Sequence, residues 1–412
     1  MNNTNKSMER RAIFFMLLCS AVYFTSYLTR KNYDAVLVEI VNTVGTTGRA
    51  AGLVSTAAFI TYGIGQLISG FVGDHIRPRS LIIIGMSATA VCNLLMPLMG
   101  SITPMIVLWG INGFAQALFW PPLVRMMAVN LDTDHYNRAC VWVSVAANIA
   151  TISVYLLASL CTAVASWKAL FLIGAVGALL MIVIWVLLAP KNDFNAPQKK
   201  KEESASEKAP SLLSSKTVVL LLVLLAAAIV LQGILRDGVA TWMPTLIADT
   251  FNMSSSVSIL SGIVLPIFSM LSYNVANAIE RRVKNELTTS ALLFGIATAS
   301  AIILIPTLNM NPLLSVLLVA ITTGCMHGIN LMLITRIPRY FDKYNKISFV
   351  SGLLNAFTYV GSGAATFLFA VLEESFGWSG TVVSWSVVAA LGMIACVVTI
   401  GILRRFRKDN EY

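Results

Sequence analysis

The stretch Tyr27-Leu-Thr-Arg-Lys-Asn-Tyr-Asp-Ala-Val-Leu-Val-Glu39 places two adjacent cations, Arg30 and Lys31, inside a hydrophobic run of about residues 12–41. A charge near the centre of a bilayer costs about 2.5–3.5 kcal/mol on insertion scales. A membrane helix therefore keeps such a charge only where it faces protein, water or a ligand. The stretch predicts an anion that is held within the membrane.

The composition of the whole chain is typical of a multi-pass membrane protein. Of the 412 residues, 57% are hydrophobic and 12% are charged, whereas soluble domains carry about 25% charged residues. The net charge of +10 indicates topology and contact with the lipid bilayer, not nucleic acid. The sequence contains no phosphate-binding glycine loop, nucleophile elbow or metal-ligand spacing, so we expect no enzyme, cofactor or metal. Its six scattered cysteines predict small buried side chains without a disulfide framework.

Twelve apolar segments have the length of about 20 residues that a membrane helix needs. The polar interruption from Lys191 to Ser215 predicts a flexible linker that separates six segments from six. We therefore expect an all-α polytopic membrane protein with two pseudo-symmetric bundles of six transmembrane helices. The expected parts are an N-terminal bundle (1–190), a cytoplasmic linker (191–215) and a C-terminal bundle (216–412). The segments cover residues 12–41, 50–72, 80–99, 104–127, 138–162, 168–189, 217–249, 256–279, 288–306, 312–335, 347–371 and 379–403.

The distribution of basic residues predicts the orientation of these segments. Most of the 29 Lys and Arg residues lie in the N-terminus, in the connections after even-numbered segments and in the C-terminal tail. The opposite side carries only Arg49 and Lys168. By the positive-inside rule, both termini are cytoplasmic in a multi-pass protein of the cell membrane.

A second buried arginine, Arg236, lies in the seventh segment, half a chain length after Arg30. Two halves with matched sites near the middle of the membrane are typical of a secondary transporter. A guanidinium offers a planar fork of five donors that suits phosphate or carboxylate, which predicts a small anionic substrate. Internal pairing is the alternative. Asp34 lies four residues after Arg30, on the same face of a regular helix, and Asp237 directly follows Arg236, although adjacent residues of a regular helix point about 100° apart. Both aspartates are candidate ion-pair or proton sites.

Polar and aromatic residues recur at helical spacing on several apolar segments, which predicts either a lined cavity or hydrogen bonds between helices. For Lys31 the alternatives are snorkelling, pairing with Asp34, or neutralising further ligand charge. His327 is interpreted as a hydrogen-bonding residue of the cavity or of a helix interface. Pro121 and Pro122 predict a break in the fourth helix. The recurring residues are Tyr23, Tyr27, Tyr62, Gln66, Gln116, Trp120, Ser144, Asn148, Thr151, His327, Asn330, Asn355, Tyr359 and Ser362.

The connection between the second and third segments carries a recognisable motif. Gly70-Phe-Val-Gly-Asp74-His-Ile-Arg77-Pro-Arg79 resembles the Gly-x-x-x-Asp…Arg loop signature of the major facilitator superfamily. We expect Asp74, Arg77 and Arg79 to form a conformational latch at the helix ends, which breaks and re-forms as the halves rock.

Four further stretches resemble the organophosphate–phosphate antiporters, the family of the bacterial glycerol phosphate and hexose phosphate carriers. They are Tyr27-Leu-Thr-Arg-Lys-Asn-Tyr33, Trp120-Pro-Pro-Leu-Val-Arg125, Arg236-Asp-Gly-Val-Ala-Thr-Trp242-Met-Pro244-Thr245 and Asn355-Ala-Phe-Thr-Tyr359-Val-Gly361. The resemblance implies that Arg30 and Arg236 clamp a phosphate. It also implies that the cavity is lined by Tyr23, Tyr27, Tyr62, Gln116, Trp120 and Tyr359.

Other positions differ from the glycerol phosphate carriers. Asn148 matches an asparagine that follows a histidine in those carriers, but Ala147 occupies the histidine position here, and Gln66 stands where they have a lysine. From the two arginines and the four matching stretches, we expect the chain to exchange an organic phosphate for inorganic phosphate by alternating access, as a monomer. The alternatives are an organic anion–proton symporter that uses Asp34 or Asp237, and a transporter-like sensor of sugar phosphates.

Overall fold

The computed structural model describes residues 3–72, 76–190, 215–344 and 347–409. In these ranges the chain forms helices and short connections, without strands. The first half contains α1 (Asn3–Leu28), α2 (Asn32–Ala35), α3 (Leu37–Val44), α4 (Gly48–Val72), α5 (Pro78–Leu95), η1 (Met96–Leu98), α6 (Ile102–Gln116), α7 (Trp120–Asn130), α8 (Thr133–Val164) and α9 (Trp167–Leu188). The second half contains α10 (Lys216–Gly233), η4 (Ile234–Gly238), α11 (Val239–Phe251), α12 (Ser255–Ser261), α13 (Val264–Val283), α14 (Glu286–Thr307), α15 (Pro312–Asn330), η5 (Leu331–Arg336), η6 (Ile337–Tyr344) and α16 (Ile347–Asp409).

Eleven stretches of the described chain are helical, long and apolar enough to cross a membrane. The last of them, Phe349–Lys408, contains two helices, because Gly377 interrupts it with a φ of +66° and a ψ of −178°. Only glycine adopts this backbone conformation readily. The final two expected segments are therefore joined at one residue, and the twelve expected spans are accounted for.

The first membrane segment is not the single helix that we expected over residues 12–41. It breaks after Leu28, and α2 begins at Asn32. The break leaves the Thr29 carbonyl without a helical partner, and this oxygen accepts the side-chain amides of Asn93 at 3.1 Å and Asn112 at 3.2 Å. Irregular backbone at this depth is tolerated because protein groups satisfy it.

The fourth segment is also broken, which confirms the prediction from its two prolines. Helix α6 ends at Gln116, and α7 begins at Trp120 with Pro121 and Pro122 in its first turn. Proline is acceptable there because the first helical N–H groups have no partner within the helix. The expected latch stays a prediction, since Asp74 lies outside the described residues, as does the linker at 191–214. Arg79, another residue of the expected latch, donates to the Val186 carbonyl at 2.5 Å.

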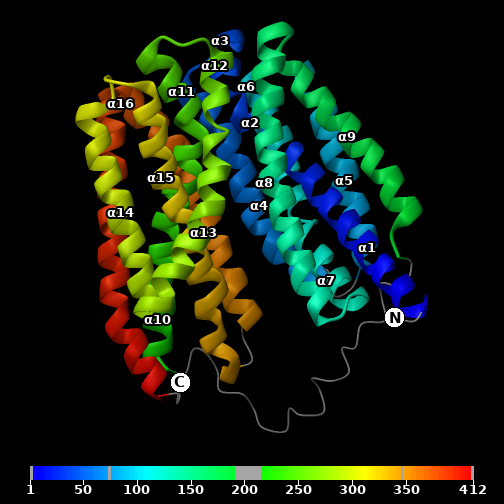
Figure 1. The fold of residues 1–412 in the computed structure, drawn as a ribbon. Coiled ribbons are helices and arrows are strands. Elements are labelled where there is room, and N and C mark those ends of the chain that lie inside the picture. Colours follow the sequence, from blue (N-terminus) through cyan, green and yellow to red (C-terminus); the bar gives the residue numbers. More distant parts are fainter. Residues whose placement is uncertain (1–2, 73–75, 191–214, 345–346, 410–412) are drawn as a thin grey trace.

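The two halves of the chain lie side by side, with α1–α9 on one side and α10–α16 on the other (Figure 1). Both termini lie at the same end of the molecule (Figure 1). One apolar cluster extends through both halves. A second cluster draws its buried residues from the first half alone, through α1, α5, α7, α8 and α9 and the short connections beside them.

Polar contacts join the halves at the end away from the termini. The Arg49 guanidinium lies 2.8 Å from the Glu374 carboxylate, and the Thr56 and Thr366 hydroxyl oxygens lie 2.7 Å apart. Ser159 of α8 donates to the Ser256 carbonyl of α12 at 2.8 Å. These contacts close the molecule at that end.

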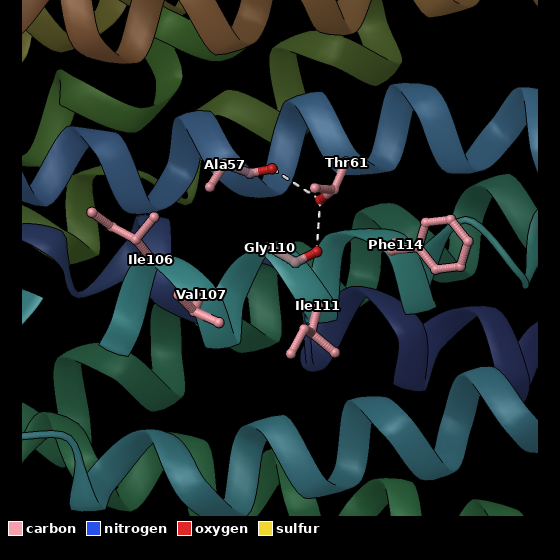
Figure 2. A pocket seen from close by; sticks show the side chains of 7 residues that line it. All are labelled: Ala57, Thr61, Ile106, Val107, Gly110, Ile111 and Phe114. Atoms are coloured by element: carbon pink, nitrogen blue, oxygen red, sulfur yellow. Dashed lines mark hydrogen bonds between the residues drawn. The ribbon is translucent and has the colours of Figure 1, made fainter. Parts of the chain in front are cut away.

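The outer surface carries many exposed apolar side chains, as a surface in contact with lipid requires. One groove of about 450 Å³ lies between α4 and α6 (Figure 2). The Thr61 hydroxyl at its edge donates to the carbonyls of Gly110 at 2.7 Å and Ala57 at 2.9 Å (Figure 2). The groove is apolar, and none of its lining residues is charged. Its lining residues are Ala57, Thr61, Ile106, Val107, Gly110, Ile111 and Phe114.

Candidate anion site between the two halves

Arg30 lies in the break of the first membrane segment. Its guanidinium carbon is 4.5 Å from the centroid of the Tyr27 ring and 4.8 Å from that of Tyr62. Within the described ranges, no carboxylate comes within ion-pair distance of this guanidinium. Ring faces attract a cation without neutralising it. Arg30 therefore keeps a full positive charge that an anionic ligand can use.

Arg236 lies in η4, a single wide turn of π-helix. Its Nη2 and Nε atoms donate to one oxygen of Asp237 at 2.6 and 3.2 Å. The Ser362 hydroxyl donates to the same oxygen at 2.7 Å. A regular helix points adjacent side chains about 100° apart, and the wider π turn brings them closer in direction. The pairing that the sequence left open is therefore present in the structure.

Lys31 connects the two halves electrostatically. Its ammonium nitrogen lies 3.8 Å from an oxygen of Asp34 and 3.7 Å from an oxygen of Asp237. Asp34 also accepts the Ser55 hydroxyl at 2.6 Å. The interruption between Arg30 and α2 removes the shared helical face on which we placed Arg30 and Asp34. Asp34 consequently pairs with Lys31 and not with Arg30.

A row of aromatic rings runs from one arginine to the other. The Tyr62 ring of α4 meets the Tyr359 ring of α16 edge to face, with centroids 4.5 Å apart. The Arg236 guanidinium carbon lies 5.5 Å from the Tyr359 centroid. On the other side, Tyr23 lies 5.2 Å from both Tyr27 and Trp120. Five of the aromatic residues singled out in the sequence are thus brought together with both arginines.

Gln116 lies in a different, polar network between helices of the first half. It is 1% exposed and accepts the Ser26 hydroxyl at 2.6 Å while donating to Thr29 at 3.0 Å and Thr89 at 2.8 Å. Its hydrogen-bonding groups are therefore engaged within the protein. A contact from Gln116 to the ligand stays a prediction.

Three asparagines of this network, Asn32, Asn93 and Asn112, were not predicted from the sequence as structural residues. The Asn32 amide donates to Asn93 at 2.6 Å, and Asn112 accepts the Thr89 hydroxyl. Single asparagines inside apolar segments were the available signal, because a buried amide requires partners. Together they hold the broken backbone that presents Arg30.

The remaining predicted residues have separate partners. Gln66 donates to the Ala117 carbonyl at 3.4 Å, and Asn148 donates to the Ser144 carbonyl at 2.9 Å. The His327 ring lies 6.3 Å from that of Tyr273, edge to face. Their roles toward a ligand stay predictions.

The helical fold and this charged site at the junction of two halves are typical of a membrane transport protein. The profile of the Major Facilitator Superfamily matches residues 19–366, and the chain belongs to that superfamily. The fold agrees with solved transporters of low sequence identity. These include the nucleoside transporter NupG (TM-score 0.72, 14% identity, 94% of this chain and 99% of that chain). They also include a bacterial homologue of the human lysosomal transporter Spinster (TM-score 0.74, 12% identity, 97% and 96%).

Several curated relatives have names that refer to phosphorylated compounds. A probable hexose phosphate transport protein of Chlamydia trachomatis is 31% identical over 118 residues, which cover 29% of this chain and 25% of the relative. The glycerol-3-phosphate transporter of Bacillus subtilis is 32% identical over 172 residues (40% and 38%). The membrane sensor protein UhpC of Escherichia coli is 33% identical over 116 residues (28% and 25%). The aligned parts therefore span about a quarter to two fifths of the relatives' own length.

Proposed function

We propose that this protein exchanges an organic phosphate for inorganic phosphate across the membrane by alternating access. The observation that carries the proposal is the pair Arg30 and Arg236, which come from opposite halves and share one row of aromatic rings. Two guanidinium forks match the three oxygens and up to two charges of a phosphoryl group. The names of the relatives from Chlamydia trachomatis and Bacillus subtilis support the same class of ligand.

The ligand drives the change of access by joining the two halves. A phosphate between Arg30 and Arg236 draws the halves together, and it shifts the equilibrium only through a higher affinity for the occluded state. The polar contacts at the end away from the termini support a state that opens toward the terminal side. We assign the terminal side to the cytoplasm.

Counterflow in proteoliposomes tests this proposal. Vesicles containing the protein are loaded with labelled phosphate and diluted into medium with or without external phosphate or sugar phosphate. We expect efflux to be fast only when an external phosphate compound is present. Efflux that ignores external anions and follows a proton gradient would replace exchange by anion–proton symport at Asp34 or Asp237. Ligand binding without any flux would favour a sensor, which the similarity to UhpC supports as the second candidate.

A paired-cysteine variant, Thr56→Cys with Thr366→Cys, tests the direction of opening. The two hydroxyl oxygens are 2.7 Å apart, so sulfur atoms in their place lie within reach of a disulfide bond. We expect oxidation to stop exchange, because it holds the halves together at one end, and a thiol reductant to restore it. The single-cysteine variants are the controls for the native thiols. Full exchange by the oxidised, cross-linked protein would show that this contact does not open during transport.

A further inference from the structure

The site between the halves contains its own anions. Five ionisable side chains meet there, three cations (Arg30, Lys31 and Arg236) and two carboxylates (Asp34 and Asp237). With these groups ionised, the site has a net charge of +1. Arg236 and Lys31 are paired with the carboxylates. Arg30 lies against the Tyr27 and Tyr62 rings and has no ion pair in the part of the chain that the structure describes.

Burial makes the total charge of this site energetically important. Asp34 and Asp237 are each 7% exposed, and Arg236 is 9% exposed. An uncompensated charge in a low-dielectric environment is strongly unfavourable. A ligand with one negative charge makes the occupied site neutral, whereas a ligand with two leaves one negative charge uncompensated.

We infer that Asp237 acts as a resident counter-anion and restricts the ligand to a single negative charge. The inference rests on the proposed function and narrows its ligand class to phosphodiesters and to the singly ionised forms of phosphate monoesters and inorganic phosphate. Asp237 is the decisive carboxylate because it contacts cations of both halves, Arg236 at 2.6 Å and Lys31 at 3.7 Å. It thereby occupies part of the position that a second phosphate charge would need.

Other titratable groups also face this cluster. They come from α8, α13 and α15 as well as from the ring row itself. A diester and a monoester meet the same groups, so any titration of the protein affects both ligands. The groups are Tyr27, Tyr62, Tyr155, Tyr273, His327 and Tyr359.

The test compares a phosphate monoester with its methyl diester between pH 5 and pH 8. Glycerol 3-phosphate and glucose 6-phosphate serve as monoesters, and binding is measured by isothermal titration on the purified full chain. With a second pKa of about 6, the singly charged monoester fraction falls about 90-fold over this range, whereas a diester keeps one charge. We expect the affinity for the monoester, relative to that for its diester, to fall by tens of fold.

Asp237→Asn removes one negative charge and gives a site of net charge +2. We expect this variant to gain affinity for the monoester at pH 8 relative to the diester. Asp249→Asn is the matched control, because Asp249 lies on the same membrane segment but accepts the Trp378 indole N–H at 3.0 Å. This control should keep the pH profile of the unaltered protein.

Two outcomes separate the inference from the proposed function. A monoester that binds as well or better at pH 8 than at pH 5, relative to its diester, overturns the charge limit and leaves phosphate transport intact. Failure of every phosphate compound to bind at any pH overturns both the charge limit and the proposed phosphate transport. The comparison of monoester and diester binding to the unaltered protein tests the charge limit even if Asp237→Asn does not fold.

Discussion

Arg30→Lys and Arg236→Lys are each expected to lower phosphate counterflow on the order of 100-fold. Lysine keeps the positive charge but lacks the planar fork that binds two phosphate oxygens at once. A charge-assisted hydrogen bond contributes about 1.5–3 kcal/mol, and each 1.4 kcal/mol is about a tenfold change in affinity. Initial rates of counterflow in proteoliposomes provide the measurement.

Arg49→Lys is the matched control for this pair of substitutions. Arg49 forms an ion pair with Glu374 at the closed end, and its side chain is 46% exposed. An exposed ion pair contributes about 0–1 kcal/mol, so its replacement should change transport only slightly. Counterflow that survives in both Arg30→Lys and Arg236→Lys would reduce the two arginines to structural roles.

The second large effect concerns folding of the second half. We expect Gly233→Val and Gly361→Val each to cost about 1–3 kcal/mol or more, as overpacking substitutions do. A Cβ atom on Gly233 would collide with the Thr358 carbonyl, and one on Gly361 with the Val230 carbonyl. Both obstacles are backbone atoms of α10 and α16, so no side chain can rotate away. Small residues permit this close approach of two membrane helices.

Gly352→Val isolates the effect of packing from that of losing a glycine. A Cβ atom on Gly352, also in α16, would meet no atom within 4 Å. Thermal unfolding in detergent, followed by circular dichroism, should therefore show a clear loss of stability for the first two variants only. Equal melting temperatures for all three would show that the contact between α10 and α16 tolerates added volume.

The sequence was sufficient to predict the membrane-spanning character of the chain, because long apolar segments report directly on burial in lipid. It also singled out Arg30 and Arg236, since a charge inside such a segment needs a reason. The break before Asn32 could not be predicted, because it depends on Asn93 and Asn112 from helices distant in sequence. The periodicity of a sequence describes one helix at a time and does not show which other helices contact it.

The ion pairs of the site also could not be predicted from helical periodicity. Lys31 and Asp237 lie 206 positions apart in sequence, and only the docking of the two halves brings them to 3.7 Å. The pairing of Arg236 with Asp237 depends on the π-helical geometry of η4. We judged that pairing from the geometry of a regular helix, which does not apply at this position.

The turn η4 makes the site sensitive to the length of the chain and not only to its side chains. A π turn is an α-helix that accommodates one additional residue, and such turns are frequent at functional sites. Loss of Ile234, Leu235 or Gly238 would restore a regular helix and turn Arg236 and Asp237 apart, although neither side chain had changed. The charge balance of the site is thus encoded partly in a count of residues, and a one-codon deletion can alter it as deeply as a substitution.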